Sequence, residues 1–166
     1  PVVVATLIDY QCPACASAHR ELSPVFSTLQ SEYGDQLGLI TIDFPLDASC
    51  NARPGVIDLH PLACHAAALV RLHGDRRTPY VEWLFSNQAS LTRESMGGPI
   101  PGLEGAPAPS RIDYEAARLD VVSDAAIAYD LGVRATPTFL VDGVLVERRP
   151  AFDMERLIRH VMAKPR

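Results

Sequence analysis

Cys12 and Cys15 form a Cys-x-x-Cys pair, the feature of this chain best suited to chemistry. Such a pair can be half of a zinc site or a pair of thiols that forms and breaks a disulfide. The apolar, β-branched run 2–8 comes just before it and predicts a strand buried between helices. Pro13 fits the first turn of a helix that follows this strand, because its missing N–H has no partner there. This context favours the redox pair.

The expected start of a helix at Cys12 gives the two sulfurs different roles. A sulfur at a helix N-terminus faces free backbone N–H groups and the positive end of the helix dipole, which both favour thiolate over thiol. We therefore expect Cys12 to be the exposed attacking sulfur and Cys15 to be the resolving sulfur. Pro13 would restrain the turn between them. The alternative is an inert, stabilising disulfide.

A second motif, the run 135–138 with the sequence Ala-Thr-Pro-Thr, comes directly before a strand-like segment. Proline is allowed at the start of a strand, and its position predicts a cis bond before Pro137. The backbone of Thr136 could then pair with an extended peptide beside the Cys12 sulfur. The alternative is a trans proline that limits an edge strand. The expected catalytic set is Cys12, Cys15 and Pro137, and the expected substrate contacts are Thr136, Pro13, Ala14 and Tyr10.

The remaining pattern predicts an α/β fold in which a helical block separates a βαβ half from a ββα half. A helix at 13–33, kinked near Pro24, and a strand at 37–44 complete the first half, with a right-handed crossover. Strands at 139–141 and 144–146, joined by an Asp142-Gly143 hairpin turn, and a helix at 152–162 form the second half.

The helical block is expected to hold four helices, at 61–72, 79–87, 113–117 and 123–130. Thr78 is the candidate N-cap of the second helix. The Gly- and Pro-rich run 97–110 predicts a surface loop, with a functional lid as the alternative. Aromatic and aliphatic residues at 80–85 would form a core face under the rim of the site; the alternative is an exposed surface that holds unfolded substrate.

The second cysteine pair, Cys50 and Cys64, follows the second strand and begins the Ala-rich helix. A disulfide here would tie the helical block to the sheet and contribute about 3 kcal/mol in the chain-entropy description. It would persist only in an oxidising compartment. A pair that relays electrons to the first disulfide is the alternative. His60 and His65 flank Cys64, but their spacing is not that of a zinc site, so no metal is expected.

Composition limits the broad class of this protein. A length of 166 residues, with 48% hydrophobic and 21% charged residues, fits one globular domain, 1–166, with the helical insertion at 55–131. The net charge of −5 argues against nucleic acid as a partner. No apolar run reaches the roughly 18 residues of a membrane span. Because the chain begins at Pro1 with a strand, we expect a trimmed mature form or a domain of a longer protein.

The two motifs and their order resemble the thioredoxin fold, and the helical block resembles that of DsbA-type disulfide oxidoreductases. Further residues are similar to thioredoxin-like domains associated with, or fused to, bacterial vitamin K epoxide reductase homologues: Phe44-Pro45-Leu46-Asp47, Cys50-Asn51, His60 and Ala63-Cys64. The resemblance implies an exported enzyme that exchanges disulfides with thiol- or disulfide-bearing protein substrates. It implies no cofactor beyond the Cys12–Cys15 pair. It also implies a periplasmic or other extracytoplasmic location, as a free or membrane-anchored domain, and a quinone-linked membrane partner of the vitamin K epoxide reductase or DsbB type.

This chain departs from the family pattern at two positions. Ala14 stands where strongly oxidising members have a histidine that stabilises the thiolate, so we expect a weaker oxidant. Thr6 stands where thioredoxins have a buried acid. Asp9 lies closer to Cys12, and we expect it at the exposed end of the strand with at most a supporting role. His19 would either line the site or pack on the helix surface. The direction of the reaction stays open, and reductase or isomerase activity and soft-metal binding by the same cysteines remain alternatives.

Overall fold

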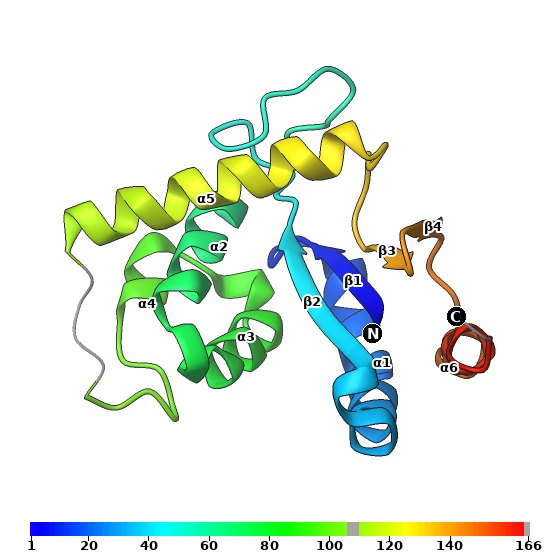
Figure 1. The fold of residues 1–166 in the computed structure, drawn as a ribbon. Coiled ribbons are helices and arrows are strands. Elements are labelled where there is room, and N and C mark those ends of the chain that lie inside the picture. Colours follow the sequence, from blue (N-terminus) through cyan, green and yellow to red (C-terminus); the bar gives the residue numbers. More distant parts are fainter. Residues whose placement is uncertain (106–109, 165–166) are drawn as a thin grey trace.

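A computed structural model describes residues 1–105 and 110–164 of the chain. Its centre is a four-stranded sheet in the order β2-β1-β3-β4. The strands are β1 (Val2–Ile8), β2 (Leu37–Asp43), β3 (Thr138–Val141) and β4 (Val144–Val146). β1 pairs in parallel with β2 and antiparallel with β3, so the two halves of the chain meet at β1 (Figure 1). The α/β fold with βαβ and ββα halves is confirmed.

Helices cover both faces of the sheet. Successive side chains of β1 point to opposite faces, and apolar side chains on each face pack against helices. Val2 and Val4 pack with residues of α1 (Pro13–Tyr33) and α6 (Ala151–Met162). Ala5 and Leu7 pack on the opposite face with residues of α5 (Arg111–Asp130). Figure 1 shows α5 crossing above the sheet and α1 with α6 on its other side.

The helical block consists of α2 (Ala63–Leu72), α3 (Arg77–Ser86) and α4 (Arg93–Gly97); α2 packs against α5, and α3 and α4 pack against α2. Single 3₁₀ turns lie at Gly34–Gln36, Gly74–Arg76 and Gln88–Ser90. The core of this block is continuous with the Cys-x-x-Cys turn, because Cys12 and Cys15 belong to the same buried cluster as Tyr80 and Leu84. Across the described ranges, no helix is long and apolar enough to cross a membrane.

The structure corrects three expectations about the helices. The pieces expected at 113–117 and 123–130 are one helix, α5, because a buried stripe at helical spacing runs through both: Ala117, Val121, Ala125 and Ala128. Thr78 is not an N-cap, because α3 begins before it at Arg77. The loop expected at 97–110 starts after α4, which includes Gly97; its residues 106–109 lie outside the described part of the chain. The expected hairpin is present, with positive φ at Asp142 (51°) and Gly143 (82°).

Candidate active site

Cys12 occupies the N-cap position of α1, where the extended β1 connection turns into the helix. Its backbone is extended (φ −73°, ψ 118°), and its carbonyl oxygen accepts the first bonds of α1 from the N–H groups of Cys15 (3.0 Å) and Ala16 (3.2 Å). Both cysteines of the pair are free thiols. Cys12 is only 6% exposed, and Cys15 1%. The expectation of an openly exposed Cys12 is therefore wrong: the Cys12 turn is packed into the helical block.

The two thiols differ in their readiness to ionise. The pKa of Cys12 is lowered to about 5, chiefly by a hydrogen bond from the Cys15 side chain, which offsets the opposing effect of burial. The pKa of Cys15 is raised far above its ordinary value, first by burial and then by its hydrogen bond to Cys12. At neutral pH the pair therefore holds one thiolate, on Cys12, and one thiol, on Cys15.

Thr136 lies against Cys12 from the other half of the fold. The Thr136–Pro137 peptide bond is cis. The Sγ atom of Cys12 lies 3.4 Å from the carbonyl oxygen of Thr136, to which the thiol form can donate a hydrogen bond. The Thr136 hydroxyl is buried beside the Cys12 sulfur, and its interaction with that sulfur helps to lower the pKa of Cys12. The three residues Cys12, Thr136 and Pro137, which the sequence places far apart, thus meet at the start of α1.

The other residues expected to touch substrate divide into two groups. Pro13 is exposed and Ala14 is half-buried beside it. Tyr10 is instead a core residue: it is 3% exposed, and its ring packs on that of Phe85 with 5.7 Å between centroids. Burial also raises the pKa of Tyr10 well above its usual value. The site turn is held from beneath by Gln88, whose side-chain amide donates to the carbonyl oxygens of Tyr10 (2.8 Å) and Cys12 (3.0 Å).

Asp9 is buried at the base of this turn, 1% exposed, rather than at the open end of the strand as expected. One carboxylate oxygen, Oδ1, accepts the N–H groups of Gln11 (2.7 Å) and Cys12 (3.1 Å). The other, Oδ2, accepts the N–H of Leu46 (2.7 Å) and lies 2.8 Å from Nδ1 of His60. The backbone N–H of Asp9 faces the Cys15 sulfur at 3.5 Å. The sequence signal for the Oδ1 contacts was an Asp that precedes a turn into a helix; nothing local signalled the contact with His60.

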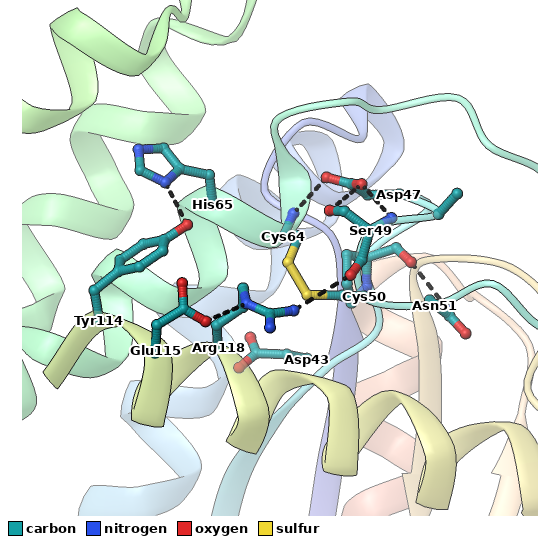
Figure 2. Close-up of a disulfide and its surroundings, with 12 residues drawn as sticks. Asp43, Asp47, Ser49, Cys50, Asn51, Cys64, His65, Tyr114, Glu115 and Arg118 are labelled. Atoms are coloured by element: carbon teal, nitrogen blue, oxygen red, sulfur yellow. Dashed lines mark hydrogen bonds and ion pairs between the residues drawn. A yellow bond between two sulfur atoms is a disulfide. The ribbon is translucent and has the colours of Figure 1, made fainter. Parts of the chain in front are cut away.

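The second cysteine pair forms the expected disulfide, Cys50–Cys64. Figure 2 shows Asp47 beside both cysteines: its Oδ2 accepts the N–H of Cys64 (3.0 Å), and its Oδ1 accepts the N–H of Ser49 (2.9 Å). The disulfide therefore joins the segment after β2 to the first turn of α2. Among the described residues, no group of three or more His, Cys, Asp or Glu side chains is arranged to hold a metal ion. In Figure 2, His65 turns instead toward Tyr114 of α5, with 2.7 Å between Nδ1 and the hydroxyl.

His19 and the aromatic residues of α3 serve packing. His19 contacts Glu82 (2.7 Å) and stacks near Phe85, and so connects α1 to α3. Phe85 and Leu84 are buried, and Trp83 is half-buried against Tyr80. This agrees with a core face under the site.

The sequence of this chain matches a known protein family over most of its length. Residues 1–160 match the family model described as Thioredoxin. The chain belongs to the thioredoxin family. The match confirms the expected thioredoxin-like fold. Comparison with curated protein sequences finds no match.

Solved structures similar to this thioredoxin-family chain support the same fold. Wolbachia pipientis alpha-DsbA1 superposes with a TM-score of 0.62 at 17% identity, covering 98% of this chain and 86% of that one. A linker-deleted variant of Proteus mirabilis ScsC gives 0.70 at 13% identity, covering 98% and 70%. The reduced form of the disulfide bond oxidoreductase DsbG from Mycobacterium tuberculosis gives 0.61 at 20% identity, covering 98% and 79%.

Proposed function

We propose that this chain is an exported thiol–disulfide oxidoreductase that exchanges disulfides with protein substrates through Cys12 and Cys15. One observation carries the proposal: Cys12, at the N-terminus of α1, has a pKa lowered to about 5, while its neighbour Cys15 is buried and remains a thiol. A purely structural disulfide does not require its two cysteines to differ in pKa. Disulfide exchange does require this difference in pKa. Cys12 must attack and leave as a thiolate, and thiolates of low pKa leave fastest, while Cys15 only resolves the mixed disulfide.

The exchange runs in two steps when the protein oxidises a substrate. A substrate thiolate attacks Sγ of Cys12 in the Cys12–Cys15 disulfide, the bond between the two cysteines breaks, and Cys15 leaves and takes up a proton. A second substrate thiolate then attacks the substrate sulfur of the mixed disulfide, and Cys12 leaves as a thiolate. The substrate has lost two electrons and formed one disulfide, and the protein holds the reduced pair. No cofactor is needed beyond the cysteines themselves.

The oxidising direction is favoured because a stable Cys12 thiolate stabilises the reduced protein, which makes its disulfide easier to reduce. The same site run in reverse is a reductase or isomerase: the Cys12 thiolate attacks a substrate disulfide and Cys15 resolves the mixed disulfide.

Substrate would lie across Cys12 and Thr136. The exposed Pro13 and the half-buried Ala14 border the sulfur on one side, and the Thr136 backbone borders it on the other. These groups suit an extended peptide that carries a cysteine, because the peptide backbone can hydrogen-bond to the Thr136 backbone while its cysteine reaches the Cys12 sulfur. Pro137 fixes the position of Thr136 in this arrangement.

The Cys50–Cys64 disulfide supports the proposed location outside the cytoplasm, in the periplasm or its equivalent, since such bonds persist in oxidising compartments. An oxidant of this kind must be re-oxidised after each turnover. We assign that step to a quinone-linked membrane protein of the vitamin K epoxide reductase or DsbB type, on the similarity of the 44–64 segment to domains that work with such partners.

Trapping the mixed disulfide tests the proposal. A Cys15→Ser variant cannot resolve, so it should accumulate a covalent adduct with a disulfide-bearing peptide, and mass spectrometry should place the adduct on Cys12. The matched Cys12→Ser variant should form none. An adduct on Cys15 in the Cys12→Ser variant at a similar rate, or no adduct in either, would overturn the assignment. Oxidation of a reduced two-cysteine peptide by the wild-type disulfide form then tests the direction.

A further inference from the structure

Asp9 poses an electrostatic problem for the proposed active site. Its side chain is fully buried, and its Oδ1 accepts the N–H of Cys12, the N-cap residue of α1. This buried carboxylate is one hydrogen bond from the backbone of the residue whose sulfur must also become negative. Like charges in a site of low dielectric constant disfavour the second ionisation. A positive charge beside Asp9 would therefore favour the Cys12 thiolate.

His60 is placed to provide that charge. Its Nδ1 lies 2.8 Å from Asp9 Oδ2, with the imidazole 17% exposed and the carboxylate wholly buried. The pKa of His60 is raised, first by its hydrogen bond to Asp9, and the negative charge of Cys12 raises it further. Because such coupling is reciprocal, the positive charge of His60 must lower the pKa of Cys12 by the same free energy. The ionisable groups that face His60 are Asp9, from the β1–α1 connection, and Cys12, from α1.

The backbone fixes His60 in this position. The carbonyl oxygen of Leu46 accepts the N–H groups of both Leu59 and His60 at 2.9 Å, while the N–H of Leu46 binds the same Asp9 oxygen as the imidazole. Two residues further on, the N–H of Leu62 donates to the Gln11 side chain at 2.6 Å, so the segment is held against the Cys12 turn on both sides of His60. His60 is thus presented by a segment far from the Cys-x-x-Cys turn in sequence.

We propose that His60 is a positioning residue for disulfide exchange, which acts through Asp9 as the counter-charge that allows this carboxylate to hold the Cys12 turn without opposing the Cys12 thiolate. This inference rests on the proposed function, in which Cys12 is the attacking sulfur. It places an imidazole beside the site of a chain that has Ala14 between its cysteines. The Cys15 hydrogen bond remains the largest influence on Cys12, so the contribution of His60 is the smaller one.

The test is the titration of Cys12, followed by thiolate absorbance and by the rate of alkylation between pH 3 and 8, which needs no substrate protein. His60→Gln removes the charge but keeps a donor, and should raise the apparent pKa of Cys12 by about one unit. It should also lower severalfold the equilibrium constant for oxidation of glutathione by the protein. The matched control is His65→Gln, a partly buried histidine bound to Tyr114, which should leave both quantities unchanged.

A double variant separates counter-charge from mere structural support. Asp9→Asn combined with His60→Gln removes both charges and should return the Cys12 pKa to within a few tenths of a unit of the wild-type value. A wild-type pKa in His60→Gln alone would overturn the inference, as would an equally raised pKa in the double variant with native circular dichroism. Failure of the proposed function would look different, because the wild-type protein would then show the low Cys12 pKa and the His60 effect while the Cys15→Ser variant formed no adduct with disulfide peptides.

Discussion

The Sγ atom of Cys12 lies 3.4 Å from the carbonyl oxygen of Thr136, across 124 positions of sequence. The contact follows from the sheet: β1 leads into Cys12, Thr136 leads into β3, and these strands are antiparallel neighbours with Leu7 opposite Thr138. A thiol can donate to this carbonyl oxygen and a thiolate cannot. Ionisation of Cys12 therefore frees the Thr136 carbonyl to accept an N–H from a bound peptide.

The first prediction concerns the acidity of Cys12. Alkylation of the reduced protein by iodoacetamide should rise with pH to a plateau with a midpoint near pH 5, because the pKa of Cys12 is lowered to about 5. The Cys12→Ser variant should react very slowly up to pH 8, since Cys15 stays a buried thiol. A midpoint near the free-cysteine value of about 8.5 would show that the Cys15 hydrogen bond and the helix N-terminus do not stabilise the thiolate.

The second prediction concerns the reduction potential of the Cys12–Cys15 pair. Reduction of a disulfide to two thiols takes up two protons, but above the pKa of Cys12 only Cys15 takes one up. Between pH 6 and 8 the potential should therefore fall by about 30 mV per pH unit, half the slope of a two-proton couple. Equilibration with glutathione at several pH values measures this slope. A slope of about 60 mV would mean that both sulfurs are protonated in this range.

The third prediction places the potential itself. The methyl side chain of Ala14 supplies no charge or hydrogen bond to Cys12, so the reduced form should be less stabilised than in the strongest oxidants. The low pKa of Cys12 should nevertheless make the pair more oxidising than thioredoxin. At pH 7 we expect a value between about −270 mV, that of thioredoxin, and about −120 mV, that of the strong oxidant DsbA. A value near −120 mV would contradict the argument from Ala14, and a value near −270 mV would contradict the argument from the low pKa of Cys12.

The fourth prediction concerns the ion pairs that hold α2 on the sheet. Arg71 donates to Asp43 of β2 (2.7 Å) and to Asp124 of α5, and burial raises the pKa of Asp43 to about 6 despite this partner. Arg71→Met should cost about 3 kcal/mol in urea unfolding at pH 7, because it leaves a buried carboxylate unpaired. The loss should shrink as the pH is lowered toward 6, because Asp43 without Arg71 takes up its proton at a higher pH than in the wild-type protein, and it should be smallest below 6, where Asp43 is protonated in both.

The matched control for Arg71 is Arg118→Met. Arg118 pairs with Glu115 at 3.0 Å on the outer surface of α5, where both side chains are substantially exposed. Surface pairs of this kind contribute about 0–1 kcal/mol. Equal losses for the two variants would mean that Arg71 does not compensate a buried charge.

Local patterns were sufficient to predict the strands, the hairpin and the Cys-x-x-Cys helix. Each of these elements is determined by residues within it or next to it. The β-branched run forms β1, Pro13 begins α1, and Asp142-Gly143 forms the hairpin turn. The same approach split α5 in two. Its buried stripe consists mostly of alanine, a weak hydrophobic signal, and only packing against α2 and the sheet shows that one helix spans the whole segment.

The details of the site depended on long-range contacts that local patterns do not contain. Asp9 follows a strand and would ordinarily be solvated; it is buried because the backbone of Leu46 and the imidazole of His60 satisfy its second oxygen. Tyr10 lies beside the Cys-x-x-Cys turn in sequence, yet its ring packs inward on Phe85 of α3. The segment between β2 and α2 sets the first outcome and α3 sets the second, and the sequence alone does not determine where either one lies.

The last prediction concerns the Cys50–Cys64 disulfide, whose loop includes His60. The double variant Cys50→Ala/Cys64→Ala should lose about 3 kcal/mol of unfolding free energy, because a chain without the cross-link gains entropy when it unfolds. If the bond is structural, the folded variant should still oxidise a two-cysteine peptide at a rate close to that of the wild-type protein. An exposed substitution in the same loop, Ala52→Ser, serves as the control and should change neither quantity. Normal stability combined with a loss of re-oxidation by an added oxidant would instead identify the pair as an electron relay to Cys12 and Cys15.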